Sequence, residues 1–138
     1  MMQITFDITR VPDASQQRYP VAYLEGRLQI AIGPVIFFDE PEIPLIEFAI
    51  SAYEWLRNTR NGQVEDFVYL SVDHEEPIIT FRRVADGLFS PHSIWQLEAA
   101  EPINANDLGV AFETYIAALQ DALKTQRNID FDSLLEAQ

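Results

Sequence analysis

Residues 73–76 read Asp-His-Glu-Glu and form the strongest local candidate for metal binding in the sequence. Three carboxylates and an imidazole offer the oxygen and nitrogen ligands that divalent cations take. The group has no second histidine at helical spacing and no glycine where a calcium-binding loop requires one. It also lies where a hairpin loop is expected, and the exposed tip of such a loop is ordinarily polar. We therefore expect an exposed loop and no metal site.

Residues 90–93, Ser-Pro-His-Ser, bring two hydroxyl groups close to a histidine in the sequence. A nucleophilic serine needs a base within hydrogen-bond reach and a third group that orients the base. Adjacent residues of a strand point to opposite faces of the sheet, so closeness in sequence does not supply that geometry. We expect Ser93 to form a hydrogen bond within the sheet and assign no catalytic residue here.

Adjacent carboxylates occur at Asp39-Glu40, Glu65-Asp66 and Glu75-Glu76, and each pair could hold one raised pKa for acid–base catalysis. A glycosidase-type pair needs a long substrate cleft, however, which so small a domain without a visible lid loop is poorly able to build. The five glycines form no phosphate-binding loop, and the absence of cysteine excludes thiolate chemistry and disulfides. We therefore expect a protein that is not an enzyme and needs no cofactor.

The charge balance is the most informative property of the composition. Asp and Glu total 22 against 9 Lys and Arg, which gives a formal net charge of −13. Such a field attracts basic partners and repels polyanions, so nucleic acid and anionic membranes are poor partners. With 48% hydrophobic residues, the 138 residues predict a single acidic domain over 1–138, whose residues 128–138 form a short helix or fray. No signal-peptide pattern is visible at the N-terminus, and a cytoplasmic location is expected.

Hydrophobic periodicity predicts the elements that position these groups. Alternation indicates strands over residues 2–9, 21–32, 35–38, 67–72, 78–84 and 88–97, with Pro91 placing the last one at a sheet edge or bulge. Three- and four-residue steps predict helices over 43–58 and 107–126. Pro44 suits the first helical turn, and Asn104 or Asn106 is the expected cap of the second helix. The prediction is an α+β fold with one antiparallel sheet of about five to six strands and two main helices, in the order βββα-βββα.

The acidic residues concentrate between residues 39 and 76, where the only basic residues are Arg57 and Arg60. If the first helix lies beside the hairpin at 64–84, these acids form one negative surface. The other interpretation is an ordinary solvated face that keeps the protein soluble. The residues expected to bind a partner are Asp39, Glu40, Glu42, Glu65, Asp66, Asp73, Glu75 and Glu76.

The order of aromatic and acidic landmarks resembles that of small bacterial immunity proteins of polymorphic or contact-dependent toxin systems. The matching segments are 37–40 (Phe-Phe-Asp-Glu), 54–56 (Glu-Trp-Leu), 75–78 (Glu-Glu-Pro-Ile) and 93–95 (Ser-Ile-Trp), followed by the closing helix. The resemblance implies an inhibitor that binds and neutralises a cognate toxin domain in the cytoplasm of the producing cell. Many such toxins are nucleases with basic clefts, for which an acidic binder competes electrostatically with nucleic acid.

The alternative function is a small-molecule-binding or enzymatic α+β domain with a pocket between the helices and the sheet. It predicts a concave cavity into which polar groups converge, for instance those of Tyr69, His92 and Ser93. A solid apolar layer at that place would argue against it.

Overall fold

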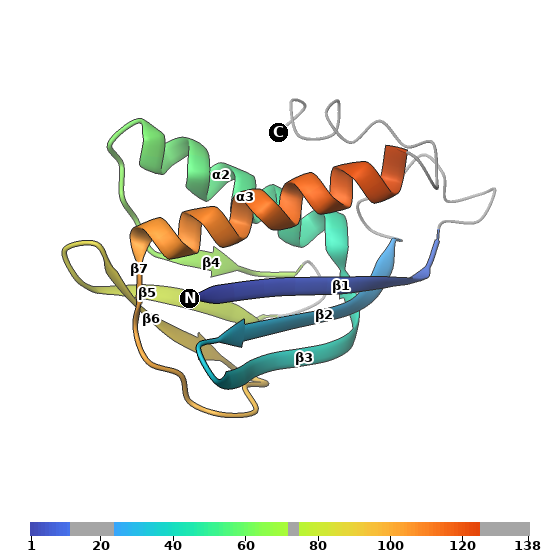
Figure 1. Cartoon of the computed structure of the whole chain (residues 1–138), viewed down its shortest axis with the longest axis horizontal. Helices are drawn as coiled ribbons and strands as arrows, with labels where there is room; N and C mark the ends of the chain where they lie inside the picture. Colours follow the sequence, from blue (N-terminus) through green and yellow to red (C-terminus); the bar gives the residue numbers. More distant parts are fainter. Residues whose placement is uncertain (12–23, 72–74, 125–138) are drawn as a thin grey trace.

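The computed structural model describes residues 1–11, 24–71 and 75–124, which form an α+β fold (Figure 1). Two antiparallel sheets and two long helices make up this part of the chain. The elements are β1 (Met2–Arg10), β2 (Glu25–Ile32), β3 (Val35–Pro44), α2 (Leu45–Arg60), β4 (Phe67–Tyr69), β5 (Ile79–Ala85), β6 (Leu88–Ser93), β7 (Ile103–Asn104) and α3 (Ala105–Ala122). The residues predicted to form a terminal helix or to fray, 128–138, lie outside the described part.

The N-terminal sheet has the strand order β1-β2-β3. Alternating burial along β1 confirms the predicted half-buried strand, with Met2 and Ile4 inside. β2 lies close to the backbone of β1 at Gly26, where a β-carbon would lie 2.0 Å from the carbonyl oxygen of Asp7. A side chain at this position would force the two strands apart, so the pairing of β1 with β2 requires glycine.

The C-terminal sheet has the strand order β4-β5-β6-β7, and all its neighbouring strands are antiparallel. The two-residue strand β7 was not predicted, and it pairs only with Leu88 and Phe89 of β6. Pro91 lies beyond that pairing, where the outer edge of β6 has no strand partner among the described residues. Proline has no N–H to donate, which explains its position at this edge and confirms the expectation from the sequence.

The prediction of one sheet of five to six strands was wrong, because the strands divide into sheets of three and four. On β3, Phe37 and Phe38 are both buried and the register with β2 shifts beside them. The carbonyl of Phe37 accepts a hydrogen bond from the N–H of Leu97, which lies in an irregular segment. The ring of Phe37 also contacts that of Phe81 on β5. The two sheets therefore meet through side chains and not through a continuous ladder.

Both helices lie on the same side of the strands and contact each other (Figure 1). α2 begins one residue after Pro44, so the proline occupies the cap position and not the first turn as predicted. Asn104 caps α3 by accepting a hydrogen bond from the N–H of Asp107, which confirms one of the two predicted caps. No helix among the described residues is long and apolar enough to cross a membrane.

Aromatic rings fill the space between the helices and the sheets. Phe48 of α2 makes edge contacts with Phe67 and Tyr69 of β4 and with Phe112 and Tyr115 of α3. All five side chains are almost completely buried. Edge-to-face packing of aromatic rings is favourable beyond their burial, so this cluster fixes α2 and α3 against β4.

Candidate functional site

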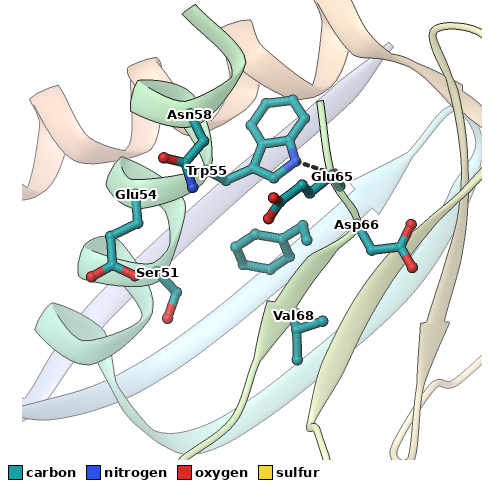
Figure 2. Close-up of a pocket in the computed structure, with 8 residues that line it drawn as sticks. Ser51, Glu54, Trp55, Asn58, Glu65, Asp66 and Val68 are labelled. Carbon is teal, nitrogen blue, oxygen red and sulfur yellow. Dashed lines mark hydrogen bonds between the residues drawn. The ribbon is translucent and has the colours of Figure 1, made fainter. Parts of the chain in front are cut away.

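A polar hollow with a volume of about 260 Å³ lies between α2 and β4 (Figure 2). We call it the α2–β4 groove. Its lining consists of helical residues on one side and the start of β4 on the other: Ser51, Glu54, Trp55, Asn58, Glu65, Asp66, Phe67 and Val68. It thus combines carboxylates and an amide with two aromatic side chains.

The helical wall follows from the period of α2. Ser51, Glu54 and Asn58 are separated by three and four residues, which places them on one stripe of a helix. Trp55 projects from the same wall but is only 5% exposed. The helix therefore presents polar groups at the mouth of the groove and an indole at its inner end (Figure 2).

The opposite wall is held in place by backbone hydrogen bonds. The indole Nε1 of Trp55 donates to the carbonyl oxygen of Glu65 at 2.8 Å, which ties α2 to the segment that leads into β4. The carboxylate of Asp66 accepts the backbone N–H of Arg83 on β5, also at 2.8 Å. The next residue, Phe67, has a buried ring. Glu65 is thus held through its main-chain carbonyl and Asp66 through its carboxylate, while both residues remain exposed.

The groove carries negative charge that nearby cations do not neutralise. Among the residues that the structure describes, no basic side chain forms an ion pair with Glu54, Glu65 or Asp66. Arg57, one turn along α2, lies over the ring of Tyr53 at 5.8 Å. Arg60 pairs with Glu113 of α3. The site is therefore suited to a guanidinium or ammonium group, whose aliphatic stem an aromatic wall can cover.

Of the predicted binding residues, Asp39, Glu40 and Glu42 all lie on β3 in the other sheet. Asp39 is already paired, since Arg27 donates to its two oxygens at 2.8 and 2.6 Å. These hydrogen bonds from Arg27 lower the pKa of Asp39, an effect that burial opposes. Asp39 is therefore the least available of these acids for an outside partner.

The remaining predicted acids flank β4. Glu65 and Asp66 precede the strand, whereas Glu75 and Glu76 lie in the connection from β4 to β5. Asp66 lies level with Arg83 of β5, whereas Glu75 and Glu76 precede β5 in a segment that is not a strand. Asp73 lies outside the described residues.

Glu54 joins Glu65 and Asp66 at the groove, although it was not among the predicted binding residues. The helical spacing of Ser51, Glu54 and Asn58 was a usable signal for a shared polar stripe. The sequence periodicity does not show that this stripe faces β4, because that is a tertiary contact.

The residues of the alternative pocket do not converge. Tyr69 is buried and donates to the carboxylate of Glu47 at 2.9 Å, and burial and that carboxylate together raise the pKa of its hydroxyl. The buried Ser93 donates to the carbonyl of Ile78 at 2.6 Å, as predicted for a hydrogen bond within the sheet. His92 is exposed on the opposite face of β6. Between the helices and the sheets lies the apolar layer of aromatic rings described above.

A second hollow of about 450 Å³ lies between the turn that joins β2 to β3 and the start of α3. Two of its polar side chains already have partners within the chain. Asn104 caps the helix, and Asp107 lies 3.6 Å from the terminal amino group. Nothing in its lining favours one class of ligand.

The described residues contain no group of three or more His, Cys, Asp or Glu side chains that could hold a metal ion. Asp73 and His74 of the candidate group at 73–76 lie outside that part of the chain.

A family model described as a domain of unknown function, DUF7878, matches residues 2–125. The match covers all the helices and strands described above. No curated protein and no solved structure shows a significant match to the chain.

Proposed function

The chain belongs to the DUF7878 family, and we propose that it is an inhibitor protein of the immunity type, which binds and neutralises a cognate bacterial toxin domain. The observation that carries this proposal is the α2–β4 groove, whose carboxylates lack basic partners among the described residues and whose inner wall is aromatic. This proposal assigns binding and not catalysis to the site, and places the protein in the cytoplasm of the producing cell.

The electrostatics of the chain favour a basic partner. A net charge of −13 attracts cations and accelerates encounter, and the attraction reaches further at low ionic strength because the Debye length is then longer. A toxin nuclease with a basic substrate cleft fits such a surface, because the carboxylates occupy the place of nucleic-acid phosphates. Long-range attraction sets the association rate, whereas contacts buried in the groove set the rate of dissociation.

The acids differ in the part they play in this proposal. Glu54, Glu65 and Asp66 contact the partner in the groove, and Glu75 and Glu76 extend the negative surface beyond the other end of β4. The three acids of β3 lie in the other sheet and contribute to the negative electrostatic field of the protein.

The test uses the product of the neighbouring gene as the partner, expressed alone to establish its toxicity and then together with this protein. Charge reversal by Glu54→Lys with Glu65→Lys is expected to abolish protection and to weaken binding at least about tenfold at low salt. Neither side chain has a partner in the described structure, so the fold is retained. The matched control, Glu98→Lys with Glu101→Lys, makes the same change in net charge at exposed positions outside the groove.

Protection by the wild type and the control but not by the groove variant would support the proposal. Equal loss in the two double variants would show that net charge acts without a specific site. Binding that does not weaken as salt increases would exclude the electrostatic mechanism.

A further inference from the structure

β4 is a three-residue edge strand that carries no lysine, proline or bulge. It occupies one end of the order β4-β5-β6-β7, so one side of it has no strand partner among the described residues. Proteins normally protect a free edge, which can pair with another chain, by keeping the strand very short or by placing lysine, proline or a bulge on it. β4 has only the first of these protections. The sequence from Phe67 to Leu70, Phe-Val-Tyr-Leu, contains none of these residues and favours strand structure throughout.

The outward-facing side chains of this segment are apolar. Phe67 and Tyr69 point into the core, whereas Val68 is 47% exposed and the following Leu70 is 50% exposed. The α2–β4 groove lies at the same strand, since Phe67 and Val68 are part of its lining. The edge is therefore bordered by a hollow on the helix side and by two exposed aliphatic side chains.

Carboxylates flank the edge at both ends. Glu65 and Asp66 lie at its beginning, with Glu54 across the groove, and Glu75 and Glu76 follow after its end. Acids at both ends discourage the pairing of two copies of this edge, because like charges directly opposite each other are destabilising. The same arrangement favours a chain that carries positive charge at both ends of a short extended segment.

We propose that an extended segment of the partner adds to the C-terminal sheet as a strand along the free edge of β4, with a basic side chain at each end. This inference rests on the proposed function and specifies the form of the partner. Main-chain hydrogen bonds to β4 supply affinity, as in other complexes formed by strand addition. Alternate side chains of the added strand contact Val68 and Leu70. The two groups of acids select a basic residue at each end of the added segment.

The test begins with a phage-displayed library of random dodecapeptides, selected on the full-length protein. We expect enriched sequences with alternating apolar residues between two basic positions. The best peptide is then synthesised, and each of its backbone amides is methylated in turn. Strand addition predicts that methylation weakens binding at every second residue and is tolerated between, because only alternate amides of a strand face β4.

Two protein variants accompany the peptide scan. Val68→Asn is expected to weaken binding about tenfold by removing an apolar contact beside the edge. Val84→Asn is the matched control, since Val84 is 54% exposed on β5, near the turn into β6, and its substitution is expected to leave binding unchanged.

Several results would overturn the inference. The absence of enriched peptides, uniform tolerance of amide methylation, or equal effects of the two valine variants would each exclude strand addition at β4. Basic peptides that bind irrespective of methylation would leave the acidic groove as a cation-binding site, so the proposed function would stand while strand addition failed. Loss of toxin protection is measured separately with the variants at Glu54 and Glu65, so the two failures are distinguishable.

Discussion

Replacing Trp55 with phenylalanine tests whether one hydrogen bond positions the wall of the α2–β4 groove. The indole Nε1 donates to the carbonyl of Glu65 at 2.8 Å, and the ring makes edge contacts with Phe89 and Phe112. A phenylalanine ring retains an aromatic group at the site but has no donor. The substitution therefore detaches the Glu65 segment from α2 without removing a charged residue.

The expected loss of stability has two components. The net contribution of one such hydrogen bond is about 1 kcal/mol. The smaller ring forfeits roughly 40 Å² of buried apolar surface, which is worth about 1 kcal/mol at about 25 cal/mol per Å². An unfolding entropy of about 2.1 cal/mol/K per residue makes 1 kcal/mol equivalent to roughly 3.5 °C in a chain of this length. The sum of about 2 kcal/mol corresponds to a decrease in Tm of about 7 °C.

Urea denaturation measures the free energy of unfolding, and hydrogen exchange measures the local effect. We expect faster amide exchange in residues 64–67 of the variant, together with weaker binding of the partner. Tyr53→Phe is the control, because Tyr53 is half-buried on the same helix and keeps its ring. A loss of stability below about 0.5 kcal/mol, the size of an ordinary surface substitution, with unchanged exchange at 64–67, would refute the role assigned to this bond.

Two further predictions concern the N-terminal sheet, the first with a comparison variant in α3. Gly26→Ala is expected to destabilise the fold by about 3 kcal/mol, because its β-carbon would collide with the carbonyl of Asp7. Gly109→Ala in α3 has room for the added β-carbon and should stabilise the fold by about 0.5–1 kcal/mol. Equal changes in Tm for the two variants would contradict this prediction. Arg27→Gln should raise the pKa of Asp39 toward the ordinary value of an aspartate, as followed by carboxyl NMR. Because folding lowers that pKa, the pair stabilises the protein above the pKa of Asp39 in the unfolded chain, and this contribution is lost as the pH falls through the folded pKa.

The local elements were largely predictable because their side-chain periods record which face is buried. Alternation along residues 2–9 identified β1, and the three- and four-residue steps identified both helices to within a few residues. β7 was missed because two residues are too few to show a period. The number of sheets was predicted wrongly because sequence periodicity does not report which strands are neighbours.

The candidate site, like the fold, could be predicted from the sequence only in part. The excess of acids and their concentration between residues 39 and 76 could be read directly from the sequence. Their spatial grouping could not be read from the sequence. Asp39 is paired with Arg27 in one sheet, whereas Glu54, Glu65 and Asp66 line the groove beside the other sheet. The sequence also placed His92 and Ser93 on opposite faces of a strand, and the structure confirms this.

The sequence by itself determined the α+β class, the helical stripes, the charge and the absence of cysteine, because each is a property of composition or of a short repeat. Only the tertiary structure decided that α2 lies beside β4, that the strands form two sheets, and that β4 is left as an edge flanked by carboxylates. These features depend on contacts between residues far apart in the chain. Aromatic packing around Phe48 and the hydrogen bond from Trp55 to Glu65 select that arrangement.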